Sequence, residues 1–208
     1  MSNFLDYIDW RGDLDFNSSP FNEVDAAILC QITYLDFEDL IPSSFTKDGI
    51  FLKDLAQKLS DAPDSQKRCD TGALINQGTA ELFYKAARSK RFENVSASGF
   101  INKIDPLNEE QFAASSFFLG KKTEPSSCIV FRGTDDTIIG WKEDFNLGYM
   151  ESVPAQHDAL TYLENAAAFF HGPLSVAGHS KGGNLALYSS ANVPEKIQKR
   201  IISIYNND

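Results

Sequence analysis

The chain has 208 residues and is 42% hydrophobic, which is enough to build one domain with a packed core and excludes a disordered protein. Its formal net charge of −10 argues against nucleic acid or an anionic membrane surface as an electrostatic partner. Its three cysteines lack metal-ligand spacing, so no metal is expected, and no cofactor is expected either. Its apolar runs are too short to cross a membrane, so no integral membrane segment is expected. Its N-terminus lacks the basic region of a signal peptide, and we therefore expect a cytoplasmic protein.

Amphipathic helices are predicted in the first part of the chain. Apolar side chains recur at helical spacing in three segments, residues 21–35, 48–59 and 79–89. Asn22 lies near the start of the first segment, at a position suited to an N-cap. Residues 1–90 are therefore expected to form a mainly helical front.

A hairpin and then alternating strands and helices are predicted in the rest of the chain. Residues 95–104 and 111–119 are strand-like, and the turn sequence Asp105-Pro106-Leu107-Asn108 between them predicts an antiparallel pair. Further strands are predicted at 128–131, 174–177 and 201–205, and further helices at 156–170 and 184–191. Such alternation predicts a mostly parallel sheet. The expected fold is a single α/β domain over 1–208, with its sheet core in 91–208.

A motif for a catalytic serine lies between the strand at 174–177 and the helix after it. Gly178-His179-Ser180-Lys181-Gly182 has the G-x-S-x-G pattern of a nucleophile elbow, a tight turn that lifts a serine out of the sheet. Residues two before and two after that serine must lack a Cβ, and Gly178 and Gly182 meet this demand. The alternative is a glycine-rich turn in which Ser180 only caps the helix. The flanking strand and helix favour Ser180 as a nucleophile, next to helix N–H groups that would stabilise an oxyanion.

A second polar segment, Phe131-Arg132-Gly133-Thr134-Asp135-Asp136, follows the buried strand at 128–131. An acyl-transfer enzyme with a nucleophile elbow keeps its second oxyanion donor at such a position. Thr134 offers a backbone N–H and a hydroxyl, and Gly133 allows a ligand to approach the backbone closely. The alternative is a polar loop with a purely structural role. That structural interpretation is preferred for Arg132, paired with Asp135, Asp136 or Asp144.

The order and spacing of these motifs resemble those of the class 3 (fungal-type) lipases. The stretches Trp141-Lys142-Glu143-Asp144-Phe145 and Gly178-His179-Ser180-Lys181-Gly182-Gly183-Asn184-Leu185-Ala186 are similar to a group of bacterial lipase-like α/β-hydrolases. The resemblance covers 129–208 and implies an α/β-hydrolase fold, Ser180 as the nucleophile, and an oxyanion hole formed by Thr134 and the backbone N–H of Lys181. The lipases usually carry leucine where this chain has Lys181. Its side chain is expected either to meet an anionic group at the pocket mouth or to extend along the surface into solvent.

The base and the acid that would complete a catalytic triad are not evident. His179 is expected to support the elbow, His171 to lie at the opposite end of the sheet, and His157 to line the cleft. The resemblance places the base and the acid after the nucleophile, so we expect the chain to be truncated after residue 208 or to be a degenerate relative. Asp208 is a candidate acid in a variant arrangement, and the alternative, which we prefer, is an ordinary turn residue.

Three functions follow from these residues. The first is a serine hydrolase of carboxylic, lipid-like esters that works through an acyl-enzyme on Ser180. The second is a catalytically incomplete binding or regulatory protein of the same fold, and the third is a thioesterase or peptidase on the same scaffold. The expected partner is a small-molecule or lipid ester, and an open sheet edge would also allow a homodimer.

Overall fold

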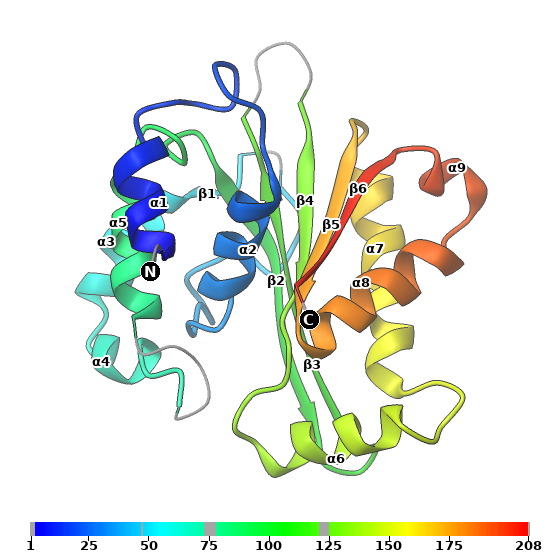
Figure 1. Cartoon of the computed structure of the whole chain (residues 1–208). Coiled ribbons are helices and arrows are strands. Elements are labelled where there is room, and N and C mark those ends of the chain that lie inside the picture. Colours follow the sequence, from blue (N-terminus) through cyan, green and yellow to red (C-terminus); the bar gives the residue numbers. More distant parts are fainter. Residues whose placement is uncertain (1–2, 47, 73–77, 121–124, 208) are drawn as a thin grey trace.

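The computed structural model describes residues 3–46, 48–72, 78–120 and 125–207, which fold around one six-stranded sheet (Figure 1). The helices are α1 (Phe4–Arg11), α2 (Glu23–Ile32), α3 (Leu52–Asp61), α4 (Ser65–Arg68), α5 (Thr79–Arg88), α6 (Ile138–Leu147), α7 (Pro154–Phe169), α8 (Lys181–Asn192) and α9 (Glu195–Gln198). The strands are β1 (Ile50–Phe51), β2 (Ser96–Asp105), β3 (Glu110–Phe118), β4 (Ser127–Phe131), β5 (Leu174–His179) and β6 (Ile201–Asn207). The described chain is therefore a mixed α/β structure.

The six strands lie side by side in the order of the sequence. The predicted hairpin is confirmed, because β2 and β3 pair antiparallel with Asp105 opposite Glu110. The parallel part is smaller than predicted: β4, β5 and β6 are parallel, whereas β3 and β4 are antiparallel. Antiparallel neighbours can be joined by a short connection, and fewer than ten residues separate β3 from β4, whereas parallel neighbours need a crossover such as α7 or α8.

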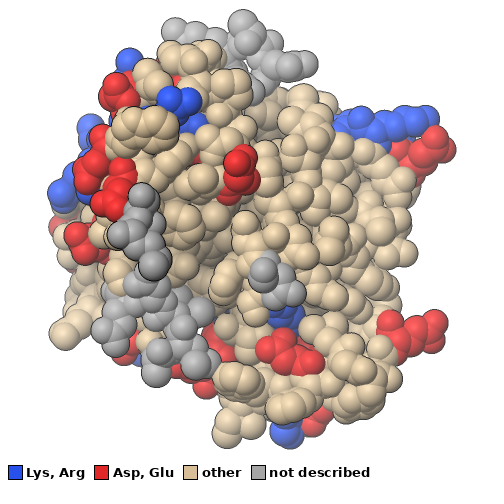
Figure 2. Space-filling model, viewed as in Figure 1, with Lys and Arg blue, Asp and Glu red and all other residues tan. Residues whose placement is uncertain are grey.

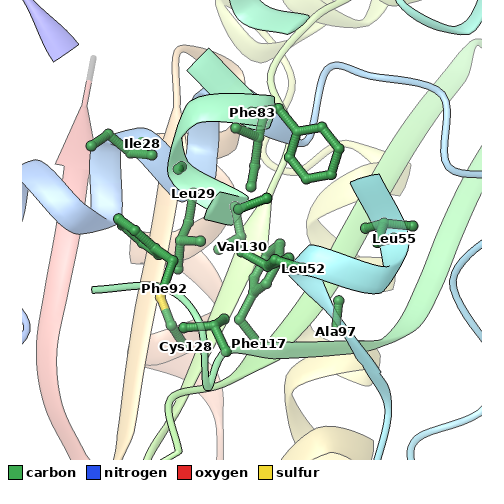
Figure 3. Close-up of a cluster of buried hydrophobic side chains, with 14 of the residues drawn as sticks. Ile28, Leu29, Leu52, Leu55, Phe83, Phe92, Ala97, Phe117, Cys128 and Val130 are labelled. Atoms are coloured by element: carbon green, nitrogen blue, oxygen red, sulfur yellow. The ribbon is translucent and has the colours of Figure 1, made fainter. Parts of the chain in front are cut away.

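Helices cover both faces of the sheet. Figure 1 shows α1–α5 on one face, α7–α9 on the other, and α6 beyond one end of the strands. Strand β4 contributes to both cores because its side chains alternate: Val130 packs towards α2 and α5, whereas Ile129 and Phe131 pack towards α7 and α8. Figure 3 shows the first core, in which Phe83 and Phe92 lie beside Phe117 of the sheet.

The predicted helices are present, with shifted ends. Asn22 caps α2 as predicted, since its side chain accepts hydrogen bonds from the N–H groups of Val24 and Asp25. The second predicted helix begins later than expected, because Ile50 and Phe51 pair with β2 as the short strand β1. Helix α1 was not predicted, although Asn3 and Asp6 form a capping box at its start.

A buried carboxyl group fastens the hairpin to α7. Lys103 Nζ lies 2.7 Å from Glu110 Oε2 and 2.9 Å from Asp158 Oδ2, and the Glu110 side chain is 3% exposed. Burial and the hydrogen bond with Asp158 raise the pKa of Glu110 and Lys103 lowers it, and the net result is a pKa of about 7.

The raised pKa of Glu110 predicts a pH-dependent contribution to stability. Between the ordinary glutamate pKa and about 7, the Glu110 carboxyl is protonated in the folded protein and ionised in the unfolded chain. The contribution of Glu110 to stability therefore falls as the pH rises through that window. Between pH 5 and pH 7.5, we expect the free energy of unfolding of the wild type to fall by about 1–3 kcal/mol more than that of Glu110→Gln. Urea unfolding of both proteins across this range measures the difference, and parallel curves would contradict the prediction.

Charge is unevenly spread over the surface. Figure 2 shows charged side chains gathered over the helices of the N-terminal half, while the surface over β6 and α8 is largely uncharged. Among the described residues, no helix combines the length and the apolar character needed to cross a bilayer.

Candidate functional site

The turn between β5 and α8 holds Ser180 in a strained conformation. β5 ends at His179 and α8 begins at Lys181, so Ser180 is the only residue between them. Its backbone angles, φ 55° and ψ −131°, fall in a region that residues with a side chain rarely adopt. The strand, tight turn and helix predicted for the motif are therefore present, and Ser180 stands at the carboxyl end of the parallel strands.

Glycines allow this turn because strand and helix cross in close contact. A Cβ on Gly178 would lie 1.9 Å from the carbonyl oxygen of Gly182, and a Cβ on Gly182 would lie 2.2 Å from that of Phe131. The requirement for glycine two residues before and after Ser180 is thus confirmed. Gly183 is less constrained, since its Cβ would lie 1.9 Å from Oδ1 of the Asn206 side chain on β6, which can move, and 3.5 Å from the nearest backbone atom.

The loop after β4 lies directly against Ser180, although 46 residues separate Thr134 from it in the sequence. A Cβ on Gly133 would lie 3.1 Å from the Cβ of Ser180 and 2.4 Å from the carbonyl oxygen of His179. Gly133 therefore permits the loop to approach the elbow closely, whereas the sequence had suggested a close approach of the loop to a ligand. The structure thus brings the Thr134 loop and the elbow together at the carboxyl ends of β4 and β5.

The Thr134 hydroxyl has a partner within the protein. Thr134 Oγ1 donates to Oδ2 of Asp144 at 2.5 Å, and Asp144 belongs to α6. A hydroxyl committed to a carboxylate is not available to an oxyanion, so the backbone N–H of Thr134 is the candidate donor. Asp144 fixes the side chain and with it the peptide that carries this N–H.

Arg132 acts as a structural clamp. Its Nη2 donates to Asn102 Oδ1 at 2.9 Å and lies 3.2 Å from Asp135 Oδ2, so Asp135 is the partner among the three acids considered. Burial lowers the pKa of Arg132, opposed by the charge of Asp135. The clamp holds the first half of the loop onto β2.

Both expectations for the Lys181 side chain are wrong. Lys181 neither meets the pocket mouth nor extends into solvent; its side chain is fully buried. Its Nζ lies 2.7 Å from Glu143 Oε2 and donates to the carbonyl oxygen and Oε1 of Gln111 at 2.6 and 2.8 Å. An ammonium group with three acceptors, one of them a carboxylate, is stable in the interior, which is why the Lys181 side chain does not extend into water.

His179 faces away from the Ser180 side chain, as predicted. Its Nδ1 lies 2.9 Å from the hydroxyl of Tyr34, a buried residue that follows α2. The Tyr34 hydroxyl also accepts a hydrogen bond from the backbone N–H of Gly133. Burial raises the pKa of Tyr34, so its hydroxyl stays protonated and can donate to His179. Tyr34 thus joins the elbow to the Thr134 loop from behind.

The other two histidines lie on α7 and after it. His157 is exposed near the start of α7, where its Nε2 lies 3.0 Å from Ser152 Oγ and its ring meets Tyr188 edge-on. His171 follows the far end of α7, at the opposite end of the sheet as predicted. The remaining candidate, Asp208, lies outside the described residues.

Helix α6 is the part of the site that the sequence interpretation missed. No helix was predicted for its residues, yet Thr137 caps a helix by accepting the N–H of Gly140. The available signals were this capping threonine and the i, i+4 spacing of Trp141 and Phe145. Several large apolar side chains of α6 and its end are exposed: Ile138, Trp141, Phe145, Tyr149 and Met150.

Within the described residues, no group of three or more potential ligands is arranged to hold a metal ion.

Of three comparisons with known proteins, one gave a match. Neither curated proteins nor solved structures gave a match. The family model described as Mbeg1-like matches residues 86–208, more than half of the chain and the whole of the segment from β2 to β6. The chain therefore belongs to the Mbeg1-like family.

Proposed function

We propose that this protein is a serine hydrolase of carboxylic, lipid-like esters, built on an α/β-hydrolase scaffold, with Ser180 as its nucleophile. The observation that carries the proposal is the backbone of Ser180, strained between two glycines at a strand-to-helix turn. Strain of this kind is retained where it serves a function. A serine that only capped a helix would adopt an ordinary extended conformation.

The mechanism follows from the two backbone segments that meet at Ser180. Ser180 Oγ attacks the ester carbonyl, and the carbonyl oxygen becomes an oxyanion. The N–H of Lys181, at the positive end of α8, and the N–H of Thr134 stabilise that charge. Collapse of the intermediate breaks the ester C–O bond, and the alcohol leaves with the proton that the Ser180 hydroxyl gave up. Water then hydrolyses the acyl-enzyme to the free acid and restores the Ser180 hydroxyl.

The exposed side chains of α6 favour the proposal of an apolar substrate. Helix α6 holds the proposed oxyanion donor Thr134 through Asp144, so it lies at the site. On the same helix Ile138 and Phe145 expose about three quarters of their surface, at 75% and 74%. Apolar surface of this kind beside an ester-cleaving centre suits an acyl chain better than a peptide, and this favours an ester over the peptidase alternative.

A fluorophosphonate probe tests the proposal, because it phosphonylates activated serines. We expect one equivalent of label on Ser180 of the wild type, no label on Ser180→Ala, and wild-type labelling of Ser60→Ala, an exposed serine of α3. Mass spectrometry of the labelled peptide identifies the site. Label that survives Ser180→Ala, or a wild type that takes none, would sink the proposal.

A binding or regulatory protein of the same fold is the second candidate. It is favoured by the histidine contacts, which direct His179 to Tyr34 and His157 to Ser152. A serine nucleophile needs a base within hydrogen-bond reach. Both of these contacts hold a histidine ring nitrogen against a residue other than Ser180, which favours a protein without catalytic activity. In this case the folded wild type stays unlabelled by the probe, which separates the two functions.

A further inference from the structure

A buried ion pair links α6 to the start of α8. The side chains of Lys181 and Glu143 are both fully buried, and Nζ lies 2.7 Å from Oε2. Burying two charges is costly, and such a pair is weak support for stability as such. The geometry that a buried pair imposes therefore explains its presence better than a gain in stability does. In this pair, Lys181 is the residue directly after Ser180.

The Glu143 carboxylate is the centre of a wider set of contacts. Besides Lys181, its Oε2 accepts the backbone N–H of Gln111 at 3.0 Å, and its Oε1 accepts that of Ala155 at 3.0 Å. These residues belong to β3 and α7 respectively. One carboxylate on α6 thus holds the hairpin, α7 and the elbow helix together, and all of its partners are rigid backbone or a buried side chain.

Two consecutive residues of α6 reach the two proposed oxyanion donors. Asp144 binds the hydroxyl of Thr134, and Glu143 binds the ammonium group of Lys181. Each acid holds the side chain of a residue whose backbone N–H is a donor in the proposed hole. The separation between those N–H groups is consequently set by one short helical segment, although the donors themselves come from different parts of the sheet.

We propose that Glu143 is a positioning residue, which acts through Lys181 to set the N–H of the elbow against the N–H of Thr134. This inference rests on the proposed function. Stabilisation of an oxyanion depends on donors placed in advance, and a displaced donor loses most of its effect without affecting how substrate binds. The pair is therefore expected to act on the reaction step rather than on binding.

The rate of phosphonylation of Ser180 by an alkyl fluorophosphonate tests this inference. Lys181→Met and Glu143→Gln are expected to lower the maximal labelling rate by about 10- to 100-fold, with the half-saturating probe concentration unchanged within about twofold. Lys142→Met is the matched control. It removes an exposed lysine from the same helix, paired with Glu109, and should label at the wild-type rate.

The double variant Glu143→Gln/Lys181→Met separates positioning from stability. It leaves no unpaired buried charge, so its melting temperature, followed by circular dichroism, should recover towards that of the wild type, while its labelling rate stays low. Recovery of both quantities would overturn the inference, as would wild-type labelling rates in the folded single variants. A wild type that is not labelled contradicts the proposed function itself, so the two failures are distinguishable.

Discussion

Replacing Asp25 with alanine is expected to lower the free energy of unfolding by about 3–5 kcal/mol, because it leaves Arg91 as an unpaired buried charge. Both side chains are fully buried, and Arg91 Nε and Nη2 donate to the two oxygens of Asp25 at 2.6 and 2.5 Å. Asp25 also accepts the N–H of Asn22, so the substitution removes half of the capping box of α2. Urea unfolding monitored by circular dichroism measures the change.

Asp9→Ala provides the control for this prediction. Asp9 forms an ion pair of similar length, 2.6 Å, with Lys85, but 68% of the Asp9 side chain is exposed. Exposed pairs contribute little because water and salt screen them, so a loss below about 1 kcal/mol is expected. Equal losses in the two variants would show that burial of the Asp25–Arg91 pair does not decide its contribution.

The effect of Asp25 reaches the candidate site through α2. This helix packs against β4, β5 and β6, and the residues after it bring Tyr34 to His179 and to the N–H of Gly133. A loosened α2 would therefore release the contact behind both the elbow and the Thr134 loop. The helical front, which the family model covers only from residue 86, thus supports the site at the other end of the chain.

The elbow could be predicted because its requirements are local. A strand, a turn with φ near 55° at Ser180 and a helix follow one another within a few residues, and the glycines that allow the crossing lie two positions on either side. The hairpin was equally predictable, since one turn sequence joins two strand-like segments. In both cases the residues that decide the structure are neighbours in the chain.

Helix α6 and the buried Lys181 could not be predicted for the opposite reason. Gly140 and two β-branched residues at its start weaken the helical signal of α6. Packing onto β3 and the hydrogen bond that Glu143 accepts from α7 outweigh this local preference. The carboxylate partner of Lys181 is Glu143, 38 residues earlier, so the burial of Lys181 depends on a tertiary contact. A lysine is rarely buried without such a partner, and nothing beside Lys181 in the sequence reveals one.

The same argument applies to the histidines. The sequence indicated that His179 supports the elbow, but Tyr34, its partner, lies 145 residues away. His157 was a candidate for the lining of the cleft, and the structure shows it exposed, in contact with Ser152 and Tyr188. Sequence position predicted the direction of the His179 side chain with respect to β5, and the fold determined what that side chain meets.

Replacing Gly178 with alanine is expected to lower the free energy of unfolding by about 3 kcal/mol or more and to abolish labelling of Ser180. The new methyl group would lie 1.9 Å from the carbonyl oxygen of Gly182 and 2.6 Å from the backbone nitrogen of Gly183. Both are backbone atoms of α8, so no side chain can rotate to make room. β5 and α8 must separate, and this shifts the N–H of Lys181 relative to the N–H of Thr134.

Gly148→Ala is the matched control, because it adds the same methyl group beyond the end of α6. Its Cβ would lie 3.3 Å from the nearest atom, the carbonyl oxygen of Phe145, and its φ of −77° suits any residue. For Gly148→Ala, we expect the free energy of unfolding to change by less than about 1 kcal/mol, and we expect the fluorophosphonate to label the variant as it labels the wild type. If Gly178→Ala instead unfolded at the wild-type urea concentration and was labelled at the wild-type rate, the crossing of β5 and α8 would be adaptable. The strain at Ser180 would then no longer distinguish a nucleophile elbow from an ordinary turn.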